Sequence, residues 1–181
     1  MRRNPRCKRC MLCQTAEYVC LMGRGTGQSG LMLVGEAPGH REDDIGKPFQ
    51  GRAGKLLDEI LGELGIDRAS IFITNIVKCR PPANRTPFPS EVVACHPHLV
   101  RELVALKPLI VVPLGRAATE VFLDRKVPIT RDRGKRFQCP WSTAFEVVPT
   151  IHPAFVLRNP TWRHALKRDL DHAWHTASNY S

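Results

Sequence analysis

Long apolar runs are missing from this chain. No window approaches the ~18 consecutive apolar residues that cross a bilayer, and residues 1–5 are not followed by the apolar core of a secretory signal peptide. The two absences predict a cytoplasmic protein with no membrane partner. The seven cysteines are an odd set in a chain without a secretory signal, so we expect metal ligands or free thiols rather than a disulfide framework.

Acidic residues are also few. The chain has 17 Asp and Glu against 27 Lys and Arg, which gives a formal net charge of +10. This surplus favours a polyanionic partner, with nucleic acid ahead of an anionic membrane surface; a solvated basic face is the alternative. With 43% hydrophobic residues, the chain can build a full core. We expect a single domain, residues 1–181, in which a cysteine loop within residues 1–30 supplies metal ligands.

Two common phosphate-binding signatures are absent. The chain has no Gly-x-x-x-x-Gly-Lys-Ser/Thr loop, and no Gly-x-Gly-x-x-Gly string opens a helix after a strand. The glycine-rich run at residues 23–30 precedes the first predicted strand, so it is interpreted as a flexible linker. Neither a nucleotide P-loop nor a dinucleotide fingerprint is therefore expected.

Short apolar runs alternate with helical patterns along the chain. The pattern predicts a three-layer α/β/α fold with a central, mainly parallel sheet of about four strands. The predicted strands are residues 31–34, 71–74, 109–114 and 146–151, and the predicted helices are residues 52–64, 89–106 with a bend at Pro97, a helix from Gly115, and residues 162–180.

Polar residues follow three of these strands. Glu36 lies in a Gly-Glu-Ala-Pro-Gly loop after the first strand, Asn75 follows the second and His152 the last. Open α/β sheets bind ligands at the carboxyl ends of their strands, so these side chains are expected to share one crevice. Taken alone, Asn75 could be a turn former and His152 a structural histidine.

Five cysteines are candidate ligands of a metal site. Cys7 and Cys10 form a C-x-x-C pair, Cys10 and Cys13 form an overlapping pair, and Cys79 and Cys95 lie far downstream. Four thiolates from three segments can hold a tetrahedral zinc ion or a [4Fe-4S] cluster, and spacing does not choose between them. The two remaining cysteines have no spaced partners and are interpreted as small buried residues: Cys20 and Cys139.

Three strings resemble the motifs of the iron-sulfur uracil-DNA glycosylases, family 4 of that superfamily. Residues 35–54 are similar to the first motif, residues 74–87 to the second, and His152 with the loop after it to the last. The resemblance runs in order along nearly the whole chain. It departs at three positions that are not expected to do chemistry, where relatives more often carry Pro, Val and Tyr: Met11, Gln50 and Phe155.

The resemblance implies an enzyme that flips uracil out of DNA and hydrolyses the N-glycosidic bond, which releases uracil and leaves an abasic site. It implies that Phe49 stacks on the base, Asn75 reads the base edge, and His152 donates to uracil O2. Glu42 would lie against C5 and exclude the methyl group of thymine. We also expect backbone hydrogen bonds near the strand end to fix the Asn75 amide.

The water-orienting group is less clearly marked. Ala37 stands where another branch of the superfamily has Asp, so Glu36 or backbone carbonyls would orient the water. Gly35, Glu36 and Ala37 complete the predicted substrate site. The side chains expected to contact DNA or fill the gap left by the flipped nucleotide are Arg52, Val156, Leu157 and Arg158, and the basic residues 130–140 form either a phosphate-contacting loop or a solvated hairpin.

The resemblance also selects the cofactor and the partner. It implies a structural [4Fe-4S] cluster, with Cys13 as a competitor for one ligand position; the expected ligands are Cys7, Cys10, Cys79 and Cys95. It implies a monomer acting on uracil in single- or double-stranded DNA. Two alternatives remain: a relative that traps uracil covalently through a histidine, which residues 81–88 lack, and an iron-sulfur DNA- or uracil-binding protein with altered specificity or no turnover.

Overall fold

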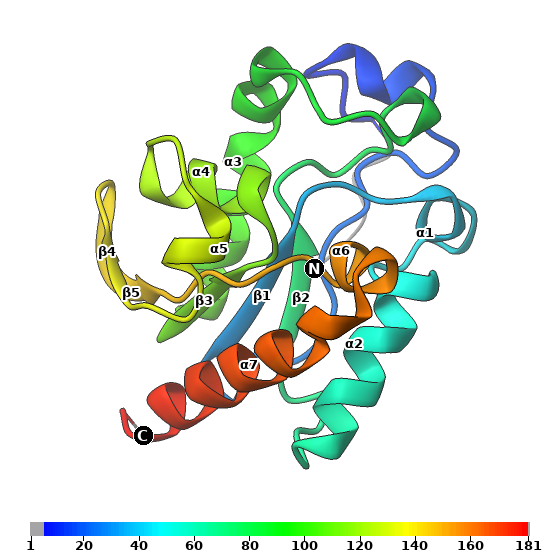
Figure 1. Cartoon of the computed structure of the whole chain (residues 1–181). Coiled ribbons are helices and arrows are strands. Elements are labelled where there is room, and N and C mark those ends of the chain that lie inside the picture. Colours follow the sequence, from blue (N-terminus) through cyan, green and yellow to red (C-terminus); the bar gives the residue numbers. More distant parts are fainter. Residues whose placement is uncertain (1–5, 181) are drawn as a thin grey trace.

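A computed structural model describes residues 6–180 of the chain (Figure 1). Two sequence predictions also involve residues outside this range: the domain of residues 1–181, and the lack of a signal peptide after residues 1–5. The described residues form a five-stranded sheet in the order β2-β1-β3-β5-β4. Its strands are β1 (Leu31–Gly35), β2 (Phe72–Asn75), β3 (Ile110–Pro113), β4 (Phe137–Cys139) and β5 (Ser142–Val147).

The sheet is parallel except at one edge. The pairs β2–β1, β1–β3 and β3–β5 are parallel, and the short strand β4 pairs with β5 in the antiparallel sense. This confirms a mainly parallel sheet and adds one edge strand to the predicted four. The last strand begins earlier than predicted and ends at Val147. Beyond the strand, the N–H groups of Val148 and Thr150 still donate to β3, to Val111 and Pro113, and Thr150 forms a parallel bridge with Leu114.

Helices cover both faces of the sheet, as the three-layer prediction requires. Alternate residues of β1 enter different cores: Leu31 and Leu33 pack in one cluster, and Met32 and Val34 pack in the other. The first core is closed by α2 (Arg52–Glu63), α6 (Pro153–Arg158) and α7 (Arg163–Ser178), and the second by α3 (Pro89–Leu106) and α4 (Arg116–Leu123) (Figure 1).

Shorter helices lie in the connections. They are α1 (His40–Ile45), α5 (Ile129–Asp132) and 3-10 turns at Met11–Gln14, Pro82–Asn84 and Pro160–Trp162. Helix α3 continues through Pro97. Along the described residues, no helix is both long enough and apolar enough to cross a bilayer.

The glycine-rich segment before β1 packs closely against the sheet rather than acting only as a linker. Arg24 forms an antiparallel bridge with Ile73. A Cβ at Gly25 would lie 1.7 Å from the carbonyl oxygen of Ile71, and the φ of Gly25 is +109°. Only glycine therefore fits, and the segment holds the N-terminal cysteine loop beside β2.

Candidate active site and metal centre

A pocket of about 440 Å³ opens at the carboxyl edge of the sheet. It brings together most of the residues expected at the base and DNA sites: Glu36, Ala37, Glu42, Phe49, Asn75, His152 and Arg158. The pocket wall also contains residues that had no predicted role: Pro38, Gly39, Ala53, Pro81, Asn84, Arg85, Ala154 and Phe155.

Asn75 ends β2 directly beside Gly35 of β1. The side chain is 2% exposed, and its Oδ1 is the one buried side-chain polar atom without a hydrogen-bond partner among the described residues. The expectation that backbone hydrogen bonds fix this amide is wrong for its oxygen. The packing around it is close, because a Cβ at Gly35 would lie 2.4 Å from Asn75 Oδ1 and 2.7 Å from Phe49 Cζ.

The Glu42 carboxylate is held on both oxygens. Its Oε2 accepts from the Gly39 N–H at 3.1 Å, and its Oε1 accepts from the N–H groups of Gln50 and Gly51, each at 2.7 Å. The carboxylate thus ties the start of α1 to the loop before α2. A group with this many charge-assisted bonds is a fixed part of the pocket wall.

Phe49 and His152 stack within the pocket. Their ring centroids are 5.9 Å apart with 30° between the planes. Phe49 has a φ of +54°, which is uncommon for a bulky residue. Gly54 makes this backbone possible, because a Cβ there would lie 1.9 Å from the Phe49 carbonyl oxygen.

His152 is fixed in one tautomer. It caps α6, and its Nδ1 accepts from the Ala154 N–H at 3.0 Å, so the ring proton is assigned to Nε2. The pKa of His152 is lowered to about 4; burial is the largest cause, the charge of Arg158 adds to the shift, and Glu42 opposes it. The ring is therefore neutral at physiological pH and has one N–H to donate.

Glu36 follows β1 and is half-buried. Burial raises the pKa of its carboxyl group, and a hydrogen bond with the Thr86 side chain opposes the rise. Thr86 belongs to the loop after Pro82–Asn84, which also contributes Arg85 to the pocket. Arg85 donates to both oxygens of Glu91, at 2.8 and 2.7 Å, and lies 3.8 Å above the ring centroid of Phe88.

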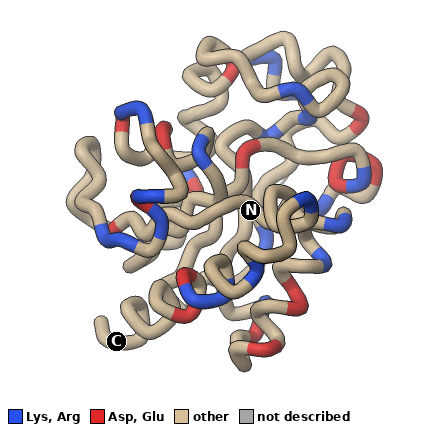
Figure 2. Tube along the Cα trace, viewed as in Figure 1, with Lys and Arg blue, Asp and Glu red and all other residues tan. Residues whose placement is uncertain are grey.

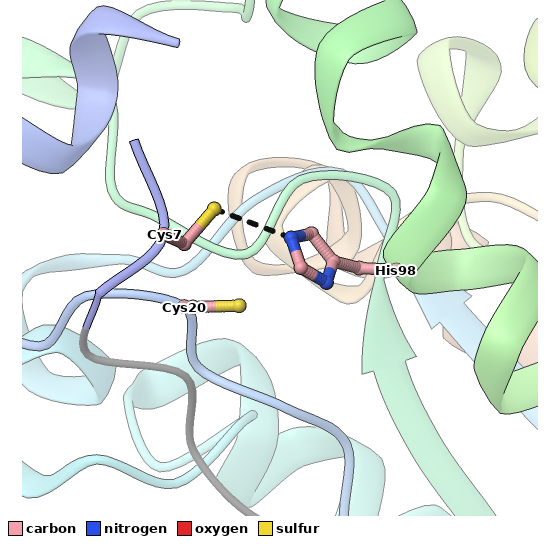
Figure 3. Close-up of side chains that lie close together, drawn as sticks. All are labelled: Cys7, Cys20 and His98. Atoms are coloured by element: carbon pink, nitrogen blue, oxygen red, sulfur yellow. Dashed lines mark hydrogen bonds between the residues drawn. The ribbon is translucent and has the colours of Figure 1, made fainter. Parts of the chain in front are cut away.

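Six cysteines gather away from this pocket, around a second, smaller void. Besides Arg9, Leu12 and Lys78, the void is lined by Cys7, Cys10, Cys13, Cys20, Cys79, Cys95 and His98. Figure 3 shows the Cys7 sulfur and the His98 ring facing each other, with Cys20 alongside; the sulfur atoms of these two cysteines and a ring nitrogen of His98 lie within 4.8 Å of one another. The seventh cysteine, Cys139, is buried in the second core, as predicted.

Each predicted ligand sulfur has a hydrogen-bond partner. Cys7 Sγ lies 3.2 Å from His98 Nε2, and the backbone of Leu12 bonds Cys10. Cys79 and Cys95 each accept a backbone N–H at 3.2 Å, and the two donors are Cys20 and Lys78. Cys20 is buried as predicted, but its place in this group has no signal in the cysteine spacing.

The chemistry of these donors fits a metal. Burial raises the pKa of the Cys79 and Cys95 thiols to about 12 each. Such thiols give up their protons when a positive metal centre compensates the thiolate charge. Several soft sulfur donors around one void suit zinc or iron.

The comparisons with known proteins identify the family. The family model of the uracil DNA glycosylase superfamily matches residues 22–177. The chain belongs to this superfamily. It is 43% identical over 159 residues to a type-4 uracil-DNA glycosylase of Thermotoga maritima, covering 86% of this chain and 82% of the relative. It is 43% identical over 169 residues to one of Sulfurisphaera tokodaii, covering 90% and 76%, and 42% identical over 170 residues to one of Pyrobaculum aerophilum, covering 90% and 87%.

The predicted DNA-contacting residues of this superfamily member differ in their exposure to solvent. Arg52 is exposed in the first turn of α2, and Leu157 and Arg158 are exposed at the end of α6. Val156 is 2% exposed and packs in the first core, so its side chain faces inward. Leu157 and Arg158 are the exposed side chains of α6, and Arg158 also lines the pocket.

The basic segment of residues 130–140 lies apart from the pocket. It contains the end of α5 and strand β4, so it forms part of a hairpin with β5. Arg133 pairs with Asp169, and Arg136 pairs with Glu146. Figure 2 shows Lys and Arg spread over many elements rather than gathered along one. The positive charge of this superfamily member is therefore distributed over its surface.

Proposed function

We propose that the protein is a DNA-repair glycosylase that flips uracil out of DNA and hydrolyses its N-glycosidic bond, which leaves an abasic site. One observation carries the proposal: the unpartnered oxygen of Asn75 and the neutral, Nε2-protonated ring of His152 belong to the same pocket. A buried polar atom without a partner costs about 1–3 kcal/mol, which a matching ligand recovers. The names of the type-4 relatives agree with this function.

Uracil satisfies both groups. Its N3–H donates to Asn75 Oδ1, the Asn75 amide donates to O4, and His152 Nε2–H donates to O2. Cytosine would present a ring nitrogen acceptor to Asn75 Oδ1 and an amino group to the amide nitrogen, so both contacts would be lost. Phe49 supplies the stacking face. Glu42 lies against C5, and its three backbone hydrogen bonds keep it from moving aside for a methyl group.

The reaction breaks the bond between C1′ and N1. The bond electrons leave with uracil, and the His152 Nε2–H stabilises the negative charge that grows on O2. Glu36 orients the water that attacks C1′ and takes its proton, which requires the carboxylate form. Pre-positioned donors in a dry pocket supply most of the rate enhancement, because no strong base is needed against an oxocarbenium-like centre.

A [4Fe-4S] cluster held by Cys7, Cys10, Cys79 and Cys95 is proposed as a structural cofactor. The hydrogen bonds to these four sulfurs support the set. Cys13 remains the competitor for the position of Cys10, because both line the same void. The cluster would link the N-terminal segment to α3 and to the loop after Asn75, and it would stiffen a surface that faces DNA.

The proposed partner is uracil-containing DNA, single- or double-stranded, bound by a monomer that uses residues 1–181 as one domain. Arg52 and Arg158 contact phosphates, and Leu157 fills the gap left by the flipped nucleotide.

The test of the proposed function is alkali-labile cleavage of uracil-containing oligonucleotides with purified metal-loaded protein. Release from single-stranded, U:G or U:A substrate is expected, and its absence from all three would refute the function. A complex that survives denaturation would favour covalent trapping.

A further inference from the structure

Lys78 is completely buried and takes no part in the chemistry above. Its ammonium nitrogen donates to three acceptors: Thr74 Oγ1 at 2.6 Å, the Asn75 carbonyl oxygen at 2.7 Å and Glu102 Oε2 at 2.6 Å. An ammonium group has three donors, so all of them are used. The ammonium group of Lys78 therefore contacts the backbone of Asn75, the residue proposed to read the base.

Glu102 of α3 anchors this arrangement. It is 0% exposed, its Oε1 accepts from the Gly23 N–H at 2.8 Å, and its Oε2 accepts from the Thr74 hydroxyl at 2.8 Å. The backbone N–H of Lys78 donates to Cys95 Sγ. One buried residue thus contacts both the cysteine-lined void and the base-reading strand end.

The buried ion pair between Lys78 and Glu102 is better explained by the groups that it positions than by stability. Replacing a buried ion pair by apolar groups of similar volume is often neutral or stabilising, so stability alone is a weak reason to have one. Within residues 6–180, no group forms a hydrogen bond that would orient the Asn75 amide oxygen. Its placement depends on the Asn75 backbone, and the carbonyl of that backbone is held by Lys78.

We infer that Lys78 is a positioning residue: its ammonium, fixed by Glu102, sets the backbone of Asn75 and thereby the amide that reads uracil. The inference rests on the proposed function. Because Lys78 holds the Asn75 carbonyl group, the backbone at the end of β2 cannot rotate freely. The Asn75 side-chain amide is therefore in its binding position before the base enters. This is preorganisation, and its loss weakens binding of the matching base.

The test is the double variant Lys78→Met with Glu102→Gln, which removes both charges and keeps the volumes similar. The new glutamine can still accept from the Gly23 N–H and donate to Thr74, so the Asn75 carbonyl is the group left without its partner. Equilibrium dialysis with labelled uracil measures the pocket, and binding of an abasic-site duplex measures the DNA surface. We expect uracil affinity to fall about tenfold or more and abasic-duplex affinity to stay within about twofold. In turnover, kcat should fall while KM for DNA changes little.

The control is Arg125→Met with Asp132→Asn, which removes a pair joined at 2.9 Å that does not line the pocket. The uracil affinity of this control variant should match that of the wild type. An active wild type and a folded Lys78→Met/Glu102→Gln variant with unchanged uracil affinity would overturn the inference, whereas a wild type that neither binds nor releases uracil would overturn the proposed function instead.

If the double variant does not fold, Lys78→Arg carries the test. It keeps the charge pair but replaces a compact ammonium by a planar guanidinium that cannot reach the same three acceptors. The same tenfold loss of uracil affinity is expected, and unchanged affinity in this folded variant would again overturn the inference.

Discussion

The base pocket and the cysteine-lined void lie at the two ends of one short segment, residues 75–79, and they differ in how their polar atoms are satisfied. In the pocket, Asn75 Oδ1 has no partner among the described residues. Around the void, sulfur atoms already accept hydrogen bonds; Cys79 and Cys95 accept them from backbone N–H groups. The pocket is thus incomplete until a base enters, whereas the protein itself completes the surroundings of the sulfur atoms.

This contrast separates activity from stability. Changes in the pocket should reduce uracil release while the protein stays folded, because a ligand rather than the fold uses those atoms. Changes around the void should reduce folding first, because the thiols join segments that are distant in sequence. Each experiment below tests whether the two regions behave in these different ways.

The largest effect is expected from removing a metal ligand. Cys79→Ala or Cys95→Ala should give colourless, poorly soluble protein, because a metal centre that joins separate segments contributes directly to the free energy of folding. The wild type should be brown, with absorption near roughly 400 nm from thiolate-bound iron. Cys139→Ala is the control: it removes a buried thiol in the second core and should keep its colour. Stoichiometric zinc in a colourless wild type would contradict the cluster assignment.

The next effect comes from Gly35→Ala. The added methyl group would overlap Asn75 Oδ1 and the Phe49 ring, and a displacement of about 1 Å at a reacting site costs on the order of 100-fold in rate. Colour and thermal stability should change much less than activity. Gly62→Ala is a matched control, because a Cβ added there would meet no atom within 4 Å. It should stabilise α2 by about 0.5–1 kcal/mol and leave uracil release unchanged.

A smaller effect is expected from pH. His152 has a pKa of about 4 in the folded protein, so its neutral, donating form persists from pH 8 down to about pH 5 and should give no inflection near 6.5. Burial raises the pKa of Glu36, and its carboxylate is the active form. The single-turnover rate should therefore fall on the acid side through a pKa above the usual range of glutamate. Glu36→Gln should be slow and lack this acid limb; an inflection near 6.5 that disappears in His152→Asn would contradict the assignment.

The smallest effect concerns duplex DNA. Leu157 is 36% exposed and Val156 is 2% exposed, so of these two apolar side chains Leu157 is the one that can fill the gap in a base stack. Leu157→Ala should slow release from duplex about tenfold and from single strands much less, because a single strand needs no unstacking of a paired base. Equal slowing on both substrates would show that Leu157 has another role.

The sequence predicted the parallel strands and the polar residues at their ends because buried strands and glycine-rich loops have strong local patterns. It missed strand β4, which is a short edge strand of three residues with only Cys139 buried. It also missed the role of Cys20, whose backbone N–H bonds the sulfur of Cys79. That contact joins residues 59 apart in sequence, and no local spacing encodes it.

Other site features depended on three-dimensional packing. The sequence placed Asn75 at a strand end but suggested that backbone hydrogen bonds fix its amide, whereas its Oδ1 has no partner among the described residues and lies close to Gly35 and Phe49. Arg85 lies within a motif, yet its contact with Glu91 and its place in the pocket wall follow from the loop geometry. The basic residues 130–140 fit either a phosphate-contacting loop or a solvated hairpin on charge alone; they form part of the β4–β5 hairpin, with Arg133 and Arg136 in ion pairs.

The most direct test of the contrast is to replace Asn75 and measure base release and stability on the same preparations. Asn75→Ala removes an unpartnered buried atom, so its thermal stability should equal or exceed that of the wild type while uracil release falls by about 100-fold or more. Asn75→Asp should also lose most uracil release, because a carboxylate repels O4. Its protonated form can donate to cytosine N3 and accept from N4, so weak cytosine release should appear and increase as pH falls. Near-normal uracil excision by Asn75→Asp would show that Asn75 does not read the base edge, and would contradict the account at its centre.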